Sequence, residues 1–238
     1  MLMSERVKYH DNKTTLEAYY AYDDQYKGNR PAIIITHDWS GRNEFACRKA
    51  DQLAELGYVG FALDMYGEGH VAKTKEEKSA LMQPFIQDRA LLLNRMFAAL
   101  EAVKKIEIVD VSQIGAIGFC FGGLCVLDLA RSGADIKGVV SFHGLLFPPE
   151  NTAKHPIKAR ILALHGFDDP MVTPDQVMAF GNEMTHAKAN WELTIYGQAM
   201  HAFTNPEAHD PGFGTVYNAH ADARSLHAMK AFFNEIFR

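Results

Sequence analysis

The sequence predicts a single α/β domain, residues 1–238, built on a doubly wound and mostly parallel sheet. Apolar runs typical of buried strands alternate with amphipathic helical patterns along the whole chain, and this alternation indicates the α/β class. The runs are almost continuously apolar, which favours a sheet covered by helices on both faces. No internal repeat, low-complexity tract or Pro/Gly/Ser-rich linker marks a second domain.

The strands are predicted from apolar runs that end at polar or glycine-containing turns. Two early segments, Arg6–His10 and Thr15–Ala21, are predicted to pair antiparallel at the edge of the sheet. The parallel part is predicted from the runs at 32–36, 58–63, 114–117, 138–142, 160–164 and 191–196.

Helices are predicted between the strands from the 3.6-residue spacing of apolar side chains and from capping signals. One helix starts at Thr173, where threonine is a suitable N-cap and Pro174 takes the first helical position. The predicted helices cover 44–57, about 85–105, the segment that begins at Thr173, and 216–236.

Composition excludes several classes of protein. The chain is 47% hydrophobic and 22% charged, with a formal net charge of -5, so nothing favours nucleic acid or an anionic membrane as a partner. No apolar run approaches the roughly 18 residues of a membrane span, and the N-terminal residues lack the apolar core of a secretory signal. The three cysteines show no CxxC spacing, which argues against a disulfide scaffold or a zinc site. We expect a cytoplasmic protein, and the sequence leaves a homodimer open.

A candidate nucleophile lies in the segment 118–123, GFCFGG, where a strand ends and a helix begins. In α/β-hydrolases the nucleophile occupies a sharp turn at such a junction, and only small residues fit two positions before and after it. Gly118 and Gly122 meet that demand around Cys120. The helix N-terminus favours a thiolate, and the amide of Phe121 would face a developing oxyanion. The alternative is that Cys120 is simply a buried cysteine in a glycine-rich turn. Cys125, five residues later, is expected to be a core residue.

A thiol nucleophile needs a base and an acid that orients the base. The segment 165–170, HGFDDP, follows one predicted strand, and 197–203, GQAMHAF, follows the next. The order of nucleophile, acid and histidine is that of the α/β-hydrolase fold, which makes His201 the candidate base. Asp168 and Asp169 both remain candidates for the acid, because an Asp-Asp-Pro sequence is also a common turn in which one aspartate only caps. His143 and His165, at strand ends, are expected to be core residues.

The loop 37–41, HDWSG, follows the first long strand, where this fold supplies a second oxyanion amide. Trp39 is the expected donor. Asp38 is a candidate to tune the proton on Cys120, and its alternative role is a cap of the loop.

These motifs resemble the dienelactone hydrolase family from about residue 30 to the end of the chain. The matching segments are GFCFGG, HGFDDPMV, YGQAMHAF, HDWSG, DMYGEG and YNAHADARSLHAMKAFF. The resemblance implies that Cys120 is the nucleophile, His201 the base and Asp169 the acid. It also implies hydrolysis of a small ester or lactone through an acyl-cysteine intermediate, with no metal or organic cofactor.

Two departures from the family bear on the substrate. The family has glutamate where this chain has the shorter Asp38. The namesake enzymes also hold the substrate carboxylate with an arginine shortly after the histidine, where this chain has 204–206, TNP. Arg89 or Arg42 is a candidate replacement, although each is more often a surface cation.

Other functions remain open from the sequence. A thioesterase of the same fold, a hydrolase-fold binding protein without catalysis, and a redox-sensing thiol at Cys120 are the alternatives. The segment 66–85 is the candidate for a lid, from its position and charge.

Overall fold

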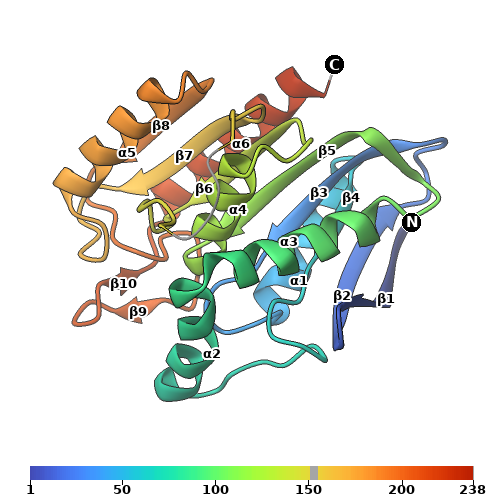
Figure 1. Cartoon of the computed structure of the whole chain (residues 1–238), viewed down its shortest axis with the longest axis horizontal. Helices are drawn as coiled ribbons and strands as arrows, with labels where there is room; N and C mark the ends of the chain where they lie inside the picture. Colours follow the sequence, from blue (N-terminus) through green and yellow to red (C-terminus); the bar gives the residue numbers. More distant parts are fainter. Residues whose placement is uncertain (151–154, 238) are drawn as a thin grey trace.

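A computed structural model describes residues 1–150 and 155–237. Within these residues one sheet of eight strands has the order β1-β2-β4-β3-β5-β6-β7-β8 (Figure 1). Strands β3 to β8 run parallel, whereas β2 is antiparallel to both of its neighbours. The bounds are β1 Leu2–Asp11, β2 Thr14–Asp23, β3 Arg30–Thr36, β4 Val59–Ala62, β5 Val109–Phe119, β6 Gly138–Phe142, β7 Arg160–Gly166 and β8 Trp191–Tyr196. The prediction of a mostly parallel sheet with an antiparallel pair at its edge is confirmed.

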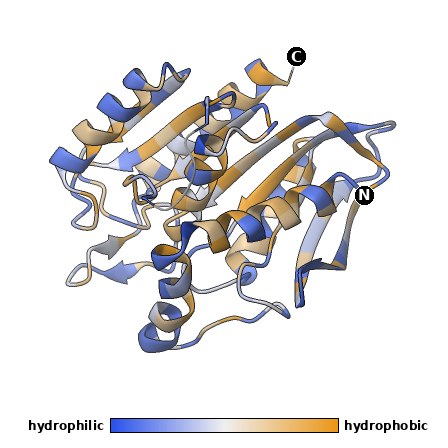
Figure 2. Cartoon of the chain, viewed as in Figure 1, coloured by the Kyte–Doolittle hydropathy of each residue, from blue (hydrophilic) through white to orange (hydrophobic). Residues whose placement is uncertain are grey.

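Helices cover both faces of this sheet. Helices α1 (Glu44–Glu55) and α6 (Ala219–Ile236) pack on one face, and α3 (Arg89–Val103), α4 (Phe121–Arg131) and α5 (Pro174–His186) pack on the other. Figure 1 shows α3 and α4 in front of the strands and α1 and α6 behind them. Two apolar clusters result, one on each side, and the strands between them are predominantly hydrophobic (Figure 2).

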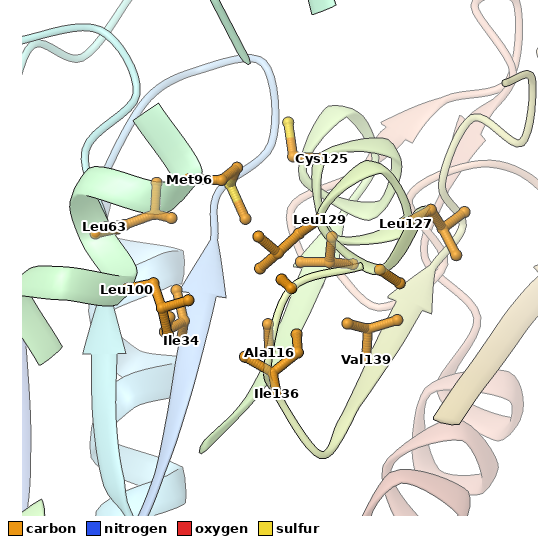
Figure 3. Close-up of a cluster of buried hydrophobic side chains, with 14 of the residues drawn as sticks. Ile34, Leu63, Met96, Leu100, Ala116, Cys125, Leu127, Leu129, Ile136 and Val139 are labelled. Carbon is orange, nitrogen blue, oxygen red and sulfur yellow. The ribbon is translucent and has the colours of Figure 1, made fainter. Parts of the chain in front are cut away.

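Figure 3 shows part of the cluster beneath α3 and α4, where Met96 and Leu100 meet Ile34 and Leu63. Cys125 belongs to this cluster and is fully buried, as predicted for a core residue.

The long helix predicted over about 85–105 is two helices in the structure. Helix α2 (Lys75–Gln87) ends before Asp88, whose extended backbone breaks the helical path. The carboxylate of Asp88 then accepts hydrogen bonds from the amides of Ala90 and Leu91 and starts α3. An N-cap aspartate stabilises the start of a new helix. The spacing of apolar residues continues across Asp88, so the spacing alone did not show that the helix is interrupted there.

The last helix begins at Ala219, later than predicted. Val216 belongs instead to a short hairpin of β9 (His209–Asp210) and β10 (Thr215–Val216), and Asn218 caps α6 through the amide of Ala221. Strands of two residues leave no periodic pattern in a sequence, so the hairpin was not predicted.

The parallel strands place their carboxyl ends at one edge of the sheet. The turns after β3, β5, β6, β7 and β8 therefore lie together, and α2 and the β9–β10 hairpin lie at the same edge (Figure 1). No helix in the described part of the chain is long and apolar enough to cross a membrane.

Candidate active site

Cys120 occupies a strained turn between β5 and α4. Its backbone has φ 56° and ψ -117°, a left-handed conformation that non-glycine residues rarely adopt. The flanking glycines are required by packing: a Cβ at Gly118 would lie 1.9 Å from the Gly122 carbonyl oxygen, and a Cβ at Gly122 would lie 2.1 Å from that of Thr36. The turn therefore has the geometry expected of a nucleophile elbow.

The half-buried Cys120 lines a pocket of about 470 Å³. His201, His143 and Trp39 line the same pocket. Apolar parts of the wall come from Phe45, Met82, Phe119, Leu145, Met171 and Phe213, and charged side chains, among them those of Lys78 and Glu207, line it as well. The pocket has the size of a small-molecule site, and its wall combines apolar surface with polar groups that converge near Cys120.

His201 pairs with Asp169 in the interior of this site. The Asp169 Oδ2 atom lies 2.7 Å from His201 Nδ1, and both side chains are almost completely buried. Asp169 also accepts a hydrogen bond of 2.8 Å from the Met171 amide, which holds its other oxygen. Asp168, the alternative acid, is exposed and makes no hydrogen bond to the histidine.

The charge environment of His201 favours its protonated form. Burial lowers the pKa of this imidazole, but the charge of Cys120 and the contact with Asp169 outweigh it and raise the pKa to about 10. The Nε2 atom is buried without a hydrogen-bond partner among the described residues. A histidine held by a carboxylate at Nδ1, with Nε2 available near a thiol, can accept and return a proton.

Two backbone amides are candidates to bind an oxyanion. Phe121 is the first residue of α4, and neither its amide nor that of Trp39 donates to another described residue. Trp39 is held from two sides, because Tyr66 Oη donates to its carbonyl at 2.9 Å and the Phe213 ring stacks on its indole at 5.6 Å.

Asp38 lines the pocket, and its carboxylate accepts a hydrogen bond of 2.7 Å from the Ser40 amide. This contact matches the loop-cap alternative. Among the described residues no hydrogen bond joins Asp38 to Cys120, so its tuning of the thiol stays a prediction.

Neither arginine considered as a substrate anchor lines the pocket. Arg89 is buried and bonds to Asp128 at 2.6 Å, and Arg42 is buried and bonds to Glu17 at 2.8 Å. The alternative that they are surface cations was wrong, because Arg89 pairs with the buried Asp128 and Arg42 with the half-buried Glu17.

Two lysines of α2 reach the pocket instead. Lys75 pairs with Asp210 of the hairpin at 2.7 Å and lies over the Phe213 ring at 4.4 Å. Lys78 lies over the Trp39 ring at 5.7 Å. The predicted lid segment thus supplies α2, whose lysines contact the hairpin and the loop that carries Trp39.

Sequence reasoning missed His143 and Thr204 as residues that line the pocket with Cys120. His143 was interpreted as a core residue, and it is buried at the end of β6, but its ring also lines the pocket beside Cys120. Burial lowers its pKa well below the usual value, so the imidazole is neutral. Only its place after a strand of the parallel sheet indicated this position.

The described residues contain no group of three or more His, Cys, Asp or Glu side chains suited to a metal ion. All three cysteines are free thiols.

Comparison with known proteins gives consistent results. The sequence model of the dienelactone hydrolase family matches residues 16–237. A probable 2-oxo-3-(5-oxofuran-2-ylidene)propanoate lactonase of Bradyrhizobium sp is 30% identical over 186 residues, which cover 74% of each chain. An uncharacterized protein of Caenorhabditis elegans is 40% identical over 60% of this chain and 92% of its own length.

Among solved structures, a dienelactone hydrolase-like promiscuous phosphotriesterase from metagenomic libraries superposes with a TM-score of 0.94. It is 36% identical, and the match covers 100% of this chain and 99% of that one.

Proposed function

This chain belongs to the dienelactone hydrolase family, and from that premise we propose that it hydrolyses a small ester or lactone through an acyl-cysteine intermediate. The observation that carries the proposal is the buried pair of His201 and Asp169, 2.7 Å apart, in the wall of a pocket that Cys120 also lines. Asp169 fixes the ring so that Nε2 is the atom that exchanges protons.

The first half of the reaction acylates Cys120. His201 Nε2 takes the thiol proton, and the resulting Sγ thiolate attacks the carbonyl carbon, whose π electrons move to its oxygen. The Phe121 and Trp39 amides donate to this oxyanion. When the oxyanion collapses, the C–O bond to the leaving group breaks, and the alkoxide takes the proton from His201 Nε2. A lactone opens by the same step, but its alkoxide stays attached to the acyl group.

The second half releases the acid. His201 accepts a proton from water, and the hydroxide attacks the carbonyl carbon of the thioester. The tetrahedral oxyanion returns to the same two amides, and its collapse breaks the C–S bond. The product is a carboxylic acid, and the thiolate of Cys120 is regenerated beside protonated His201.

The pocket favours an acyl group that is mainly apolar. Aromatic and methionine side chains contribute apolar surface, two lysines and three carboxylates also line the pocket, and its volume of about 470 Å³ suits a compact substrate. The family's arginine for a substrate carboxylate is absent, which supports a substrate other than dienelactone itself. Two lysines line the pocket, and Lys75 pairs with Asp210. Lys78 of α2 is therefore the cation that we propose takes the place of the missing arginine.

The alternatives differ in what they predict for Cys120. A binding protein requires no acylation, and a thioesterase prefers a thioester over its matched oxygen ester. A redox-sensing thiol needs a resolving cysteine, and Cys125 is buried in the core. Three free thiols agree with a reducing compartment, and we propose the cytoplasm.

The test is turnover of matched 4-nitrophenyl esters, a small lactone and a thioester by the wild type and Cys120→Ala. One phosphotriester belongs in the panel because of the phosphotriesterase relative. We expect ester or lactone turnover and a transient acyl mass on Cys120 in the wild type, and neither in Cys120→Ala. Turnover that survives in Cys120→Ala would falsify the assignment of the nucleophile. Binding of a panel member without acylation would favour the binding protein.

A further inference from the structure

His143 hydrogen-bonds both to the backbone of Cys120 and to Thr204 in the loop that carries His201. Its Nδ1 atom accepts a hydrogen bond of 3.2 Å from the Cys120 amide, which also donates to the Phe142 carbonyl at 3.0 Å. Its Nε2 atom lies 2.8 Å from Thr204 Oγ1. Because Nδ1 accepts, the ring proton is on Nε2, and this proton is donated to the threonine hydroxyl.

The ring is confined by its neighbours as well as by these bonds. It contacts the edge of the His201 ring at a centroid distance of 5.2 Å and packs against Phe203 at 5.0 Å. The His143 backbone has φ 39°, a left-handed conformation that a side chain makes costly. The surroundings therefore hold this imidazole in one orientation.

The second bond matters because His201 is carried by a long loop. Thr204 lies three residues after His201, in the segment that continues into the β9–β10 hairpin. The loop returns from the end of β8, whereas Cys120 is fixed between β5 and α4. His143, at the end of β6, connects the two.

We propose that His143 is a positioning residue that, through Thr204, holds the His201 loop at a fixed separation from Cys120. The proposal rests on the proposed function, because it assigns a role in the same proton exchange. In this role His143 acts by holding His201 in place and does not itself contact the substrate's reacting atoms. Misplacing a catalytic group by about 1 Å can cost about a hundredfold in rate, so a single hydrogen bond at this point is consequential.

The charged and titratable groups that face the His143 ring favour the neutral form of its imidazole. They are His201, Cys120, Lys49 and His165. A second positive charge beside protonated His201 would oppose the proton that His201 must hold, and a protonated Nδ1 would no longer accept from the Cys120 amide. A neutral imidazole satisfies both partners.

The experiment compares Thr204→Val with Thr36→Val. Each change removes one buried threonine hydroxyl and keeps the shape, but among the described residues the hydrogen bond of the Thr36 hydroxyl goes to the Met96 sulfur, away from the His201 loop. The readout is the rate of alkylation of Cys120 by iodoacetamide across pH, followed by mass spectrometry. This readout does not require that any ester be a substrate. Turnover numbers, KM values and melting temperatures are measured in parallel.

We expect Thr204→Val to slow alkylation at neutral pH and to lower kcat, each by about tenfold, with KM within about twofold of wild type. Thr36→Val should stay within about twofold for alkylation and kcat. His143→Gln keeps an amide donor near the Nε2 position, so it should retain more of both rates than His143→Ala.

The inference is overturned if Thr204→Val and His143→Ala alkylate with wild-type rates and pH profile. Lower melting temperatures alone, with unchanged chemistry in the folded protein, would show a purely structural role and would also overturn it. If the wild type hydrolyses nothing in the panel while alkylation still depends on Thr204, the proposed function fails and the positioning role of His143 stands.

Discussion

Asp169 Oδ2 lies 2.7 Å from His201 Nδ1, and both side chains are sealed from solvent. The pair joins the turn after β7 to the loop after β8, and it leaves the opposite nitrogen of the imidazole at the pocket beside Cys120. Two adjacent aspartates compete for this position in the sequence, and in the structure only Asp169 turns inward.

The first prediction separates these two aspartates. Asp169→Asn should lower kcat/KM by about 10³ to 10⁴, because an amide can stabilise the unproductive tautomer of His201 and carries no charge for the imidazolium. Asp168→Asn should change it by less than about threefold. Steady-state kinetics on one activated ester measures both. Equal losses, or a larger loss in Asp168→Asn, would contradict the role given to Asp169.

The second prediction concerns the glycines of the elbow. Gly118→Ala should destabilise the fold by about 1–3 kcal/mol or more and abolish activity, because its methyl group would collide with the Gly122 carbonyl. Gly197→Ala is the matched control, since a Cβ there meets nothing within 4 Å and the backbone is not left-handed. Urea unfolding measures both. A stable and active Gly118→Ala protein would show that the elbow relaxes more easily than its geometry indicates.

The third prediction is a loss of stability in mild acid. Burial lowers the pKa of His37, His143 and His165 below the usual 6.5. Below pH 6.5 the unfolded chain therefore binds protons that the native state does not bind, and the free energy of unfolding falls as the pH falls. Each histidine contributes up to about 1.4 kcal/mol per pH unit in that range.

Urea unfolding between pH 6.5 and 5 measures this slope, because above pH 6.5 the raised pKa of His201 makes an opposing contribution. His165→Gln should reduce the slope by up to about 1.4 kcal/mol per pH unit, which corresponds to one proton, because a glutamine at this buried position does not titrate. His165 suits the test because its Nδ1 has no hydrogen-bond partner among the described residues. An unchanged slope would mean that His165 titrates alike in the native and unfolded states.

The fourth prediction concerns substrate charge. Lys78→Met should raise KM for an ester whose acyl group carries a carboxylate by up to about fivefold, the size expected of a partly exposed ion pair. KM for the matched neutral ester should stay within about twofold. Arg89→Met serves as the contrast, because it removes one of the two arginines that pair with buried Asp128 and should lower stability without this selectivity. If both esters respond equally to Lys78→Met, the lysine does not read substrate charge.

Much of the fold could be predicted because the strands of a doubly wound sheet are apolar on both faces. The runs at 138–142 and 191–196 coincide with β6 and β8. The errors occurred where another interaction replaced the apolar pattern. At Asp88 a capping carboxylate divided one expected helix, and at Val216 a short hairpin took the residue that the helical spacing included.

The candidate site was predictable to a similar extent and for a related reason. Cys120 and His201 each follow a strand, and parallel strands end at the same edge, so strand order alone indicated that their loops meet. His143 follows a strand as well, yet nothing in its local sequence indicated two hydrogen bonds to residues as distant as Cys120 and Thr204.

The sequence by itself determined the alternation of strands and helices, the glycine-flanked turn at Cys120 and the chain order of the candidate acid and histidine. These features depend on local propensity, periodicity and steric limits, all of which operate over a few residues. Only the tertiary structure decided which side chains meet. It turned Asp169 inward, buried Arg89 against Asp128 and placed His143 between Cys120 and Thr204. Such pairings depend on how distant loops pack at one edge of the sheet, and no short-range pattern encodes that packing.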